Sequence, residues 1–260
     1  MDAVFSQLWL LPFMLARVLA FFRALPFMAT ESLPPLLVTA AGGSLVPLFW
    51  PLAAQGCPEN APPLAITLAL LLKEAGLGFA LGFSAALLFH AVMGAGFLLD
   101  NQRGASQGDV TDPSSQEQTS PVGALFFQWT TALLCSLGAL PIFLVAFVES
   151  YVWWPVFSPC PPSGTEALYA FTLGQMNAFF HMLLALAAPI AALYFLSDFA
   201  LGLVNRFAPQ LNVFVLSMPV KSGLMLFLLL LYLPALYHIL TGEIARLPSI
   251  FTALNGAWHE

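Results

Sequence analysis

The sequence predicts an all-α, polytopic membrane protein. The mean hydropathy of the 260-residue chain is +0.87, and 60% of its residues are hydrophobic whereas only 8% are charged. A soluble domain carries roughly 25% charged residues and could not cover this much apolar side-chain surface with so few charges. About six apolar segments approach the length of a membrane span. We therefore expect helices that are covered by lipid, or by partner proteins in its place.

The apolar segments are irregular in length. Bilayer thickness requires about 20 apolar residues in a spanning helix. The first segment is short, the second contains Pro47 and Pro51, and the third is long enough to cross with a margin. These differences favour tilted or partly broken helices over a plain bundle. The six segments are 8–22, 36–54, 64–98, 122–148, 168–204 and 213–237.

Linkers rich in Pro, Gly and Ser separate the apolar segments and contain helix start signals. Ser120 precedes Pro121, which predicts an N-cap followed by a first-turn proline. The sequence Ser163-Gly-Thr-Glu166 is a capping-box pattern that predicts the start of the fifth helix.

Small residues recur at four-residue spacing within the third segment, at Gly78, Gly82 and Ala86. Such a ridge lets two helix backbones approach closely, which is a main source of attraction between helices in lipid. Glycine is also frequent in membrane helices for other reasons, and that alternative stays open at this point. We expect a specific close contact.

The distribution of Lys and Arg predicts an orientation. With six crossings, the linkers that hold Cys57 and Cys160 lie on one side of the membrane and contain neither Lys nor Arg. The linkers near Arg23, Arg103 and Arg206 lie on the other side, which the positive-inside rule makes cytoplasmic. Both termini are then outside.

Three cysteines provide neither a metal cluster nor a dense disulfide framework. Cys57 and Cys160 both lie in Pro-rich polar linkers and are a candidate disulfide pair on the periplasmic side. Cys135 lies in an apolar segment, and we expect it to be a small buried hydrophobic residue.

One stretch is polar in a chain whose other long segments are nearly all apolar. We call residues 100–121 (DNQRGASQGDVTDPSSQEQTSP) the polar segment. It contains Asp100, Arg103, Asp109, Asp112 and Glu117. Such a concentration indicates a function for this place in the molecule. It also divides the chain into two halves.

Ionisable residues also lie within or at the ends of apolar segments, where they mark partner contacts, cavities or ion pathways more often than chance. Lys73 and Glu74 are adjacent, so they point about 100° apart on a helix and are poorly placed to pair. Each therefore needs another partner or water, and Asp198 and Lys221 could supply one from other helices. The remaining members of this group are His90, Glu149, His181 and His238.

Several function classes find no support in the sequence. The formal charge of −6 gives no basic patch, and no nucleic-acid-binding module is present. The N-terminus has no positive n-region, so we expect the first segment to be retained. The histidines lack metal-ligand spacing. Gly104 to Gly108 matches the G-x-S-x-G nucleophile pattern, but it follows an apolar helix where that motif needs a strand. We expect no catalytic residue, cofactor or metal.

Two stretches are specific enough to indicate a family: FLLDNQRGAS (97–106) followed by SQEQTSPVG (115–123), and RFAPQLNVFVLSMPVKSG (206–223). Together with KEAGLG (73–78) and the SY-x-x-WPV pattern of residues 150–156, they resemble the SctT family of type III secretion export apparatus proteins. That family includes YscT, SpaR and HrcT, with FliR as its flagellar relative. The DNQRG sequence is similar to the injectisome branch. Met93 stands where the family pattern leads us to expect an acidic residue.

The resemblance implies one export gate domain over residues 1–260, without enzymatic activity, in the bacterial inner membrane and projecting into the periplasm. Its implied partners are SctR- and SctS-like gate subunits, an SctU-like switch protein, inner rod and needle proteins, unfolded secreted substrates and membrane lipid, but no nucleic acid. The helices would form tilted hairpins in a hetero-oligomeric channel. The polar segment would contribute to the plug that closes the resting channel.

The resemblance and the residue chemistry together give two sets of candidate residues. The channel or plug set is Arg103, Gly104, Ser106, Gln107, Asp109, Asp112, Gln116 and Gln118. The assembly set is Lys73, Glu74, Gly78, Gly82, Asp100, Gln102, Asp198, Arg206, Asn212 and Lys221.

The alternative from another class is a small-molecule or ion transporter that uses Lys73, Glu74 and Asp198 in an ion relay. Against it, we detect no internal repeat, although inverted or parallel repeats are common in such folds.

Overall fold

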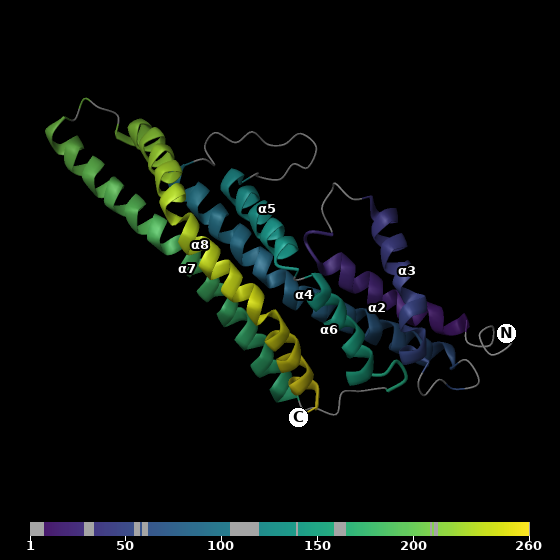
Figure 1. Cartoon of the computed structure of the whole chain (residues 1–260). Coiled ribbons are helices and arrows are strands. Elements are labelled where there is room, and N and C mark those ends of the chain that lie inside the picture. Colours follow the sequence, from purple (N-terminus) through teal and green to yellow (C-terminus); the bar gives the residue numbers. More distant parts are fainter. Residues whose placement is uncertain are drawn as a thin grey trace. The chain divides into compact units, whose positions relative to one another are not determined.

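The structure is a computed structural model, and it describes residues 8–28, 34–54, 58, 62–104, 120–138, 140–158, 165–208, 210 and 213–259. These residues form helices and connecting turns without any strand, so the all-α prediction is confirmed (Figure 1). The elements are η1 (Leu8–Leu10), α2 (Leu11–Ala24), α3 (Pro35–Ala53), α4 (Leu64–Arg103), α5 (Pro121–Ser136), α6 (Leu140–Trp153), α7 (Thr165–Phe207) and α8 (Val213–His259).

Four of the described helices, α3, α4, α7 and α8, are long and apolar enough to cross a membrane. The predicted segment 122–148 is broken into α5 and α6, which would add a fifth span if the pair is counted as one. The predicted segment 8–22 forms η1 and α2. Helix α2 has only 14 residues and is about 21 Å long, shorter than the roughly 30 Å hydrocarbon core.

Helix α8 continues beyond the predicted apolar segment 213–237, to His259. The apolar segment ends near residue 237 because hydropathy falls there, while the helical pattern continues. Buried residues still recur every three or four positions, at Leu240, Ile244, Leu247 and Phe251, as in an amphipathic helix. His238, which hydropathy placed at a helix end, therefore lies inside α8.

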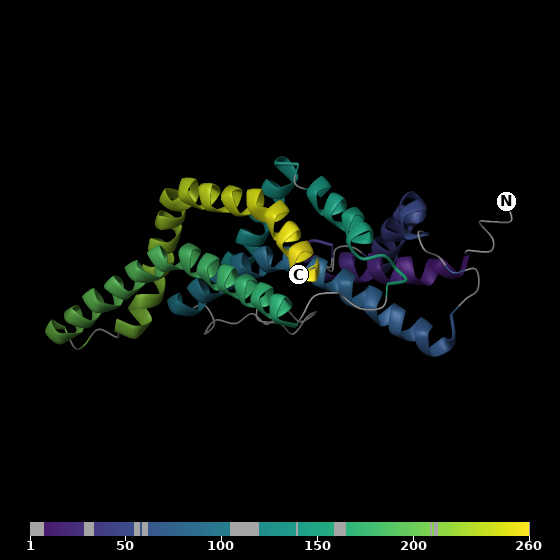
Figure 2. The ribbon, with the colours of Figure 1, turned by 90° about the horizontal axis from the view of Figure 1, so that it is seen from below.

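The chain divides into two compact units, and α4, α7 and α8 contribute residues to both. The first unit comprises Met1–Leu87, Gly138–Gln175 and Arg246–Glu260, and the second comprises Leu88–Leu137 and Met176–Ala245. In the first unit α2 packs against α3 and α4. In the second unit α7 and α8 run in opposite directions (Figures 1 and 2), and the Tyr232 hydroxyl donates to the carbonyl of Ala185 at 2.9 Å.

The first unit has an aromatic core. The ring centroids of Phe21 and Phe147 lie 5.0 Å apart, and those of Phe49 and Phe147 lie 5.6 Å apart. Tyr151 packs edge-on against Phe147 with a centroid distance of 5.5 Å. These rings bring α2, α3 and α6 together.

The close contact predicted at Gly78 and Gly82 is confirmed. A Cβ atom on Gly78 would overlap the carbonyl oxygen of Arg17 in α2. A Cβ atom on Gly82 would lie 2.5 Å from the carbonyl oxygen of Phe21 and 2.7 Å from the Cβ of Ala24. The two glycines therefore let the backbone of α2 lie directly on α4, and Ala86 is fully buried one turn later.

The predicted cap at Ser120 is also confirmed. Ser120 is the N-cap of α5, its hydroxyl accepts a hydrogen bond from the Gly123 amide at 2.9 Å, and Pro121 occupies the first turn. The capping box at Ser163 and the candidate pair Cys57 and Cys160 lie outside the described residues.

Cys135 is exposed, so its predicted burial was wrong. The buried side of α5 consists of Gly123, Phe126, Thr130 and Leu134, which recur at helical spacing. Cys135 follows Leu134 and points about 100° away from that side. An apolar segment alone does not identify which side of the helix is buried.

We predict that Gly78→Ala or Gly82→Ala destabilises the fold by about 1–3 kcal/mol, because each added methyl group meets the backbone of α2 and cannot be relieved by a rotamer change. Thermal unfolding of the purified chain in detergent measures the effect. Gly76→Ala is the matched control, because a Cβ atom on Gly76 meets nothing within 4 Å. Equal unfolding temperatures for all three variants would contradict the close contact.

Candidate functional site

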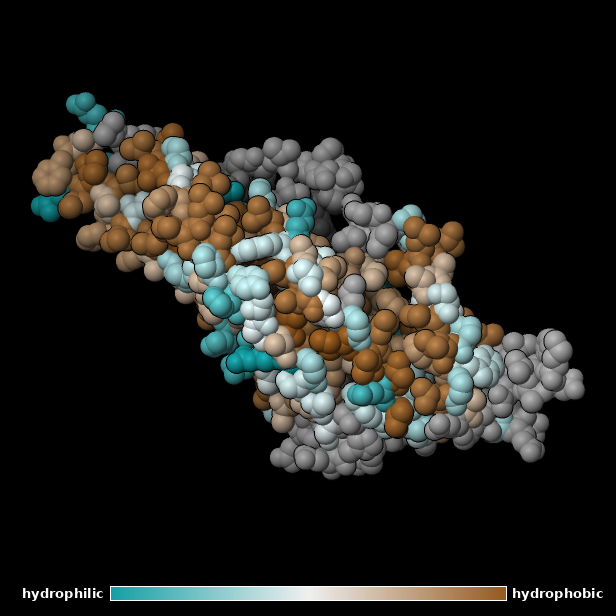
Figure 3. All heavy atoms as spheres, in the orientation of Figure 1, coloured by the Kyte–Doolittle hydropathy of each residue, from teal (hydrophilic) through white to brown (hydrophobic). Residues whose placement is uncertain are grey.

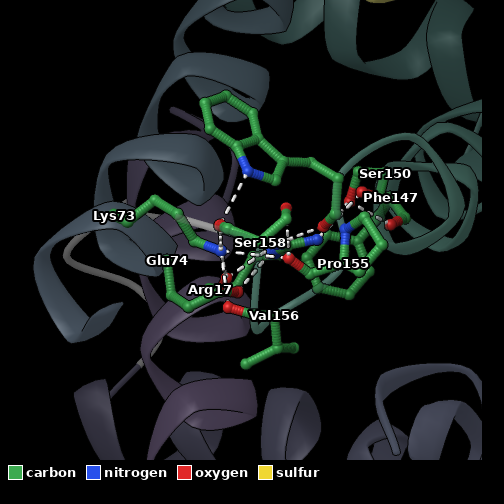
Figure 4. Close-up of polar contacts among 9 residues, drawn as sticks. Arg17, Lys73, Glu74, Phe147, Ser150, Pro155, Val156 and Ser158 are labelled. Carbon is green, nitrogen blue, oxygen red and sulfur yellow. Dashed lines mark hydrogen bonds and ion pairs between the residues drawn. The ribbon is translucent and has the colours of Figure 1, made fainter. Parts of the chain in front are cut away.

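A buried ion pair joins α2 to α4 in the first unit (Figure 4). The Arg17 guanidinium donates to the Glu74 carboxylate from Nε to Oε2 at 2.6 Å and from Nη2 to Oε1 at 2.9 Å. Neither side chain has any exposed surface. Two parallel hydrogen bonds of this kind are strong and fix the relative orientation of both side chains.

Arg17 also holds the C-terminal end of α6. Its Nη1 donates to the Ser150 carbonyl at 3.0 Å, and its Nη2 donates to the Trp154 carbonyl at 3.0 Å. The ring of Tyr151 lies 4.2 Å from the guanidinium carbon, in cation–π geometry. The buried guanidinium is thus satisfied by α4 on one side and by α6 on the other.

Lys73 completes this group, which we call the ion cluster (Arg17, Lys73 and Glu74). Its Nζ donates to the carbonyls of Pro155 at 3.0 Å, Val156 at 2.6 Å and Ser158 at 3.0 Å. The cluster contains two cations and one anion. The carbonyl oxygens of Pro155, Val156 and Ser158, which follow α6, carry partial negative charge and offset the excess positive charge.

The sequence-based expectation that Lys73 and Glu74 are poorly placed to pair was wrong. The Nζ of Lys73 lies 3.1 Å from Oε1 of Glu74, because the long lysine side chain bends toward its neighbour while it reaches the carbonyls that follow α6. The expectation that each residue needs a further partner is confirmed. Glu74 pairs with Arg17, which our selection of ionisable residues missed. A single cation within the apolar segment 8–22 was the available signal.

The second unit contains a group that joins the two ends of the polar segment. Asp100, in the last turns of α4, is buried. Its Oδ1 accepts from Nε of Arg103 at 2.8 Å. Its Oδ2 accepts from the Ser120 hydroxyl at 2.6 Å and from the Val122 amide at 2.9 Å. We call Asp100, Arg103 and Ser120 the clasp.

The helices at the clasp approach closely through glycine. A Cβ atom on Gly96 would lie 2.5 Å from the Cα of Gly123. Gly104 ends α4 with a φ of 83°, a left-handed conformation that glycine adopts without strain. Close packing and the Asp100 hydrogen bonds thus hold α5 on α4 at this place.

Lys221 ties the last turn of α4 to α7 and α8. Its Nζ lies 2.7 Å from Oδ1 of Asp198 in α7 and donates to the Gln102 carbonyl at 2.9 Å. The structure therefore pairs Asp198 and Lys221 with each other, whereas the sequence suggested them as partners for Lys73 or Glu74. Gln102 takes part through its backbone.

The structure describes only some of the remaining predicted site residues. Arg206 is exposed in the last turn of α7. No group of three or more His, Cys, Asp or Glu residues that could hold a metal ion occurs in the described parts of the chain. The predicted residues outside the described ranges are Ser106, Gln107, Asp109, Asp112, Gln116, Gln118 and Asn212.

Comparisons with known proteins agree on one family. The family described as "Bacterial export proteins, family 1" matches residues 8–247. The chain is 39% identical to the Yop proteins translocation protein T of Yersinia pestis over 224 residues, 84% of each protein. It is 30% identical over 251 residues to the surface presentation of antigens protein SpaR of Salmonella typhimurium, 94% of this chain and 89% of that protein. The flagellar biosynthetic protein FliR of Bacillus subtilis is 30% identical over 224 residues, 85% of each protein.

We predict that Glu74→Leu and Arg17→Met each destabilise the chain by about 3–5 kcal/mol, because each leaves the partner charge buried and unpaired. The double variant should lose markedly less than the sum of the two single variants. Thermal unfolding of all four combinations gives this coupling energy.

Glu149→Gln is the control for the ion cluster variants, because this carboxylate is exposed on α6. It should leave the unfolding temperature unchanged. Single-variant losses that simply add in the double variant would show that the pair does not act as a unit.

Proposed function

Since the chain belongs to the bacterial export proteins of family 1, we propose that it is a structural, non-enzymatic subunit of the inner-membrane export gate of a type III secretion system. Its several long apolar helices and its family together support a multi-pass protein of the inner membrane. The two compact units share three helices, which supports treating residues 1–260 as one export gate domain.

The observation that carries this proposal is the length of the exposed apolar surface on α7. The stretch Tyr169–Phe207 has 39 residues and is about 58 Å long, almost twice the roughly 30 Å hydrocarbon thickness of a bilayer. Large apolar side chains are exposed along all of it, from Tyr169 (65% exposed) through Phe180 and Phe199 to Phe207 (80% exposed). A bilayer that is crossed once cannot cover this surface.

Partner proteins can cover what the bilayer cannot. Figure 3 shows hydrophobic side chains over much of the face formed by the last turns of α7 and the first turns of α8. Such a surface suits a hetero-oligomer of tilted helical hairpins, part of which projects from the membrane into the periplasm. We assign SctR- and SctS-like subunits as the partners, around a channel for unfolded substrates. The SctU-like switch protein, inner rod and needle proteins would contact the two ends of the channel.

The polar segment is the part of the chain that we assign to channel closure. Residues between Arg103 and Gln118 combine Ser, Gln, Gly and Asp, which can contact a passing polypeptide or seal against one another without forming an apolar core. The clasp keeps both ends of this stretch together on α4 and α5. Of the remaining assembly residues, Arg206 is exposed in the last turn of α7, where a partner can reach it, whereas Asn212 lies outside the described residues.

The transporter alternative is weakened by the internal pairing of its candidate relay residues. Glu74 is fully buried against Arg17, and Asp198 is paired with Lys221. A carboxylate that is already paired with a cation of the same chain is less available to bind an ion.

We predict that the chain leaves detergent extracts in a large complex when it is co-expressed with SctR- and SctS-like subunits. Both partners should co-purify with an affinity tag on this chain and stay bound through size-exclusion chromatography, because they shield the exposed apolar side chains of α7 from water. Recovery of a monodisperse single chain in the presence of both partners would favour the transporter.

We predict that deletion of residues 106–118 leaves the complex assembled but open to small solutes. Assembly should persist because α4 and the capped α5 are held together by contacts outside the deletion. The measurement is small-solute influx into cells that express the gate subunits, together with native gels of the complex. An assembled deletion complex that admits no more solute than the wild type would assign closure to the partner subunits.

A further inference from the structure

We infer that Asp100 is a positioning residue that fixes where the chain leaves α4 and where it enters α5, independently of the residues between. All of the contacts that support this role lie in the described parts of the chain. Its consequence for secretion rests on the proposed function.

One carboxylate serves both ends of the connection. From the α4 side, Asp100 receives Nε of Arg103 at 2.8 Å and Nη2 at 2.7 Å, both on Oδ1. From the α5 side, it receives the Ser120 hydroxyl and the Val122 amide, both on Oδ2. Each carboxylate oxygen therefore binds one helix end, Oδ1 the end of α4 and Oδ2 the start of α5. The rigid carboxyl group sets the distance between these two helix ends.

Asp100 also extends the N-cap of α5. The first amides of a helix lack intrahelical acceptors, and Ser120 satisfies the amide of Gly123. Asp100 satisfies the amide of Val122 and orients the Ser120 hydroxyl by accepting its proton. A negative charge is favourable at this helix end. The start of α5 is thus defined by a residue twenty positions earlier in the sequence.

The chemistry of the site requires a carboxylate of this length. Asparagine would keep one acceptor oxygen but place an NH₂ group against either the Arg103 or the Ser120 and Val122 donors. Glutamate would keep the charge but carries one more methylene group, while Gly96 and Gly123 fix a short distance between the two helices.

Lys221 holds the same end of α4 from a different direction. Its bond to the Gln102 carbonyl places a cation at the C-terminal end of α4, where the helix dipole favours positive charge. Met218 of α8 lies 3.5 Å from the position that a Cβ atom on Gly104 would take. The exit from α4 is therefore fixed by α8 as well as by α5.

The test is hydrogen–deuterium exchange at single-amide resolution on the complex co-purified with its SctR- and SctS-like partners. Asp100→Ala should speed exchange of the Val122 and Gly123 amides by about tenfold or more, since a charge-assisted hydrogen bond is lost. Ser120→Ala should speed Gly123 more than Val122. Asn101→Ala is the matched control, because this neighbouring side chain is exposed, and it should change neither amide.

A second arm tests positioning rather than general stability. Amides in α2 and α7 should keep wild-type exchange rates in Asp100→Ala. If the alanine variant fails to fold, Asp100→Asn takes its place, and it should speed exchange of the Val122 and Gly123 amides by a smaller factor. Solute influx should rise in Asp100→Ala and should not rise further when residues 106–118 are also deleted. Arg103→Ala should give a smaller change at Val122 than Asp100→Ala.

The inference is overturned if Val122 and Gly123 exchange at wild-type rates in a folded Asp100→Ala or Asp100→Asn protein. It is also overturned if both variants speed exchange equally in all helices. Failure of the proposed function is distinguishable, because a chain that does not associate with the partners can be measured alone in detergent and still reports on these amides.

Discussion

The buried pair of Arg17 and Glu74 is the interaction on which the first unit depends, and it depends in turn on a glycine. Gly78 lies one helical turn after Glu74, and its missing side chain lets α4 touch the carbonyl of Arg17 itself. The same close approach brings the guanidinium to the carboxylate at 2.6 Å. A larger residue at position 78 would separate both pairs of groups at once. Packing and charge satisfaction are therefore coupled here, and neither can be changed alone.

Helix α4 carries a second pair of a close-contact glycine and a buried carboxylate in the second unit, and here the glycine comes before the carboxylate. Gly96 contacts Gly123 of α5, and Asp100, one turn later, accepts hydrogen bonds from Ser120 and Val122. In an apolar environment the burial of apolar surface gives little preference for one helix neighbour over another. Close contact between the helix backbones provides dispersion attraction. A buried polar group that requires its hydrogen-bond partner then determines which turns of the two helices lie against each other. Two such pairs on one helix define the neighbours of α4 at both of its ends.

Sequence reasoning found the features that depend on local chemistry. The cap at Ser120 and the ridge at Gly78 and Gly82 follow from spacing alone, and both are present. It failed where a long side chain reaches a distant partner, as Lys73 does with the carbonyls of Val156 and Ser158. It also missed Arg17, since a cation in a short apolar segment resembles a helix end. Hydropathy could not detect the amphipathic end of α8 or the exposed side of α5. These properties depend on which neighbours surround a helix.

Several charged residues in the described parts of the chain pair with one another inside it, and this bears on how the chain could recognise partners. Glu74, Asp100 and Lys221 are all buried and already paired. Among the described residues, exposed charges such as Arg23, Glu149 and Arg206 remain available for recognition by complementary charge. Under the proposed function, selection between SctR- and SctS-like neighbours would rest on the shape of the exposed apolar helix faces. A shape-based contact needs rigid helices, and rigidity is what the ion cluster and the clasp provide. The buried charges would then serve assembly indirectly, because they hold each apolar face in one fixed form.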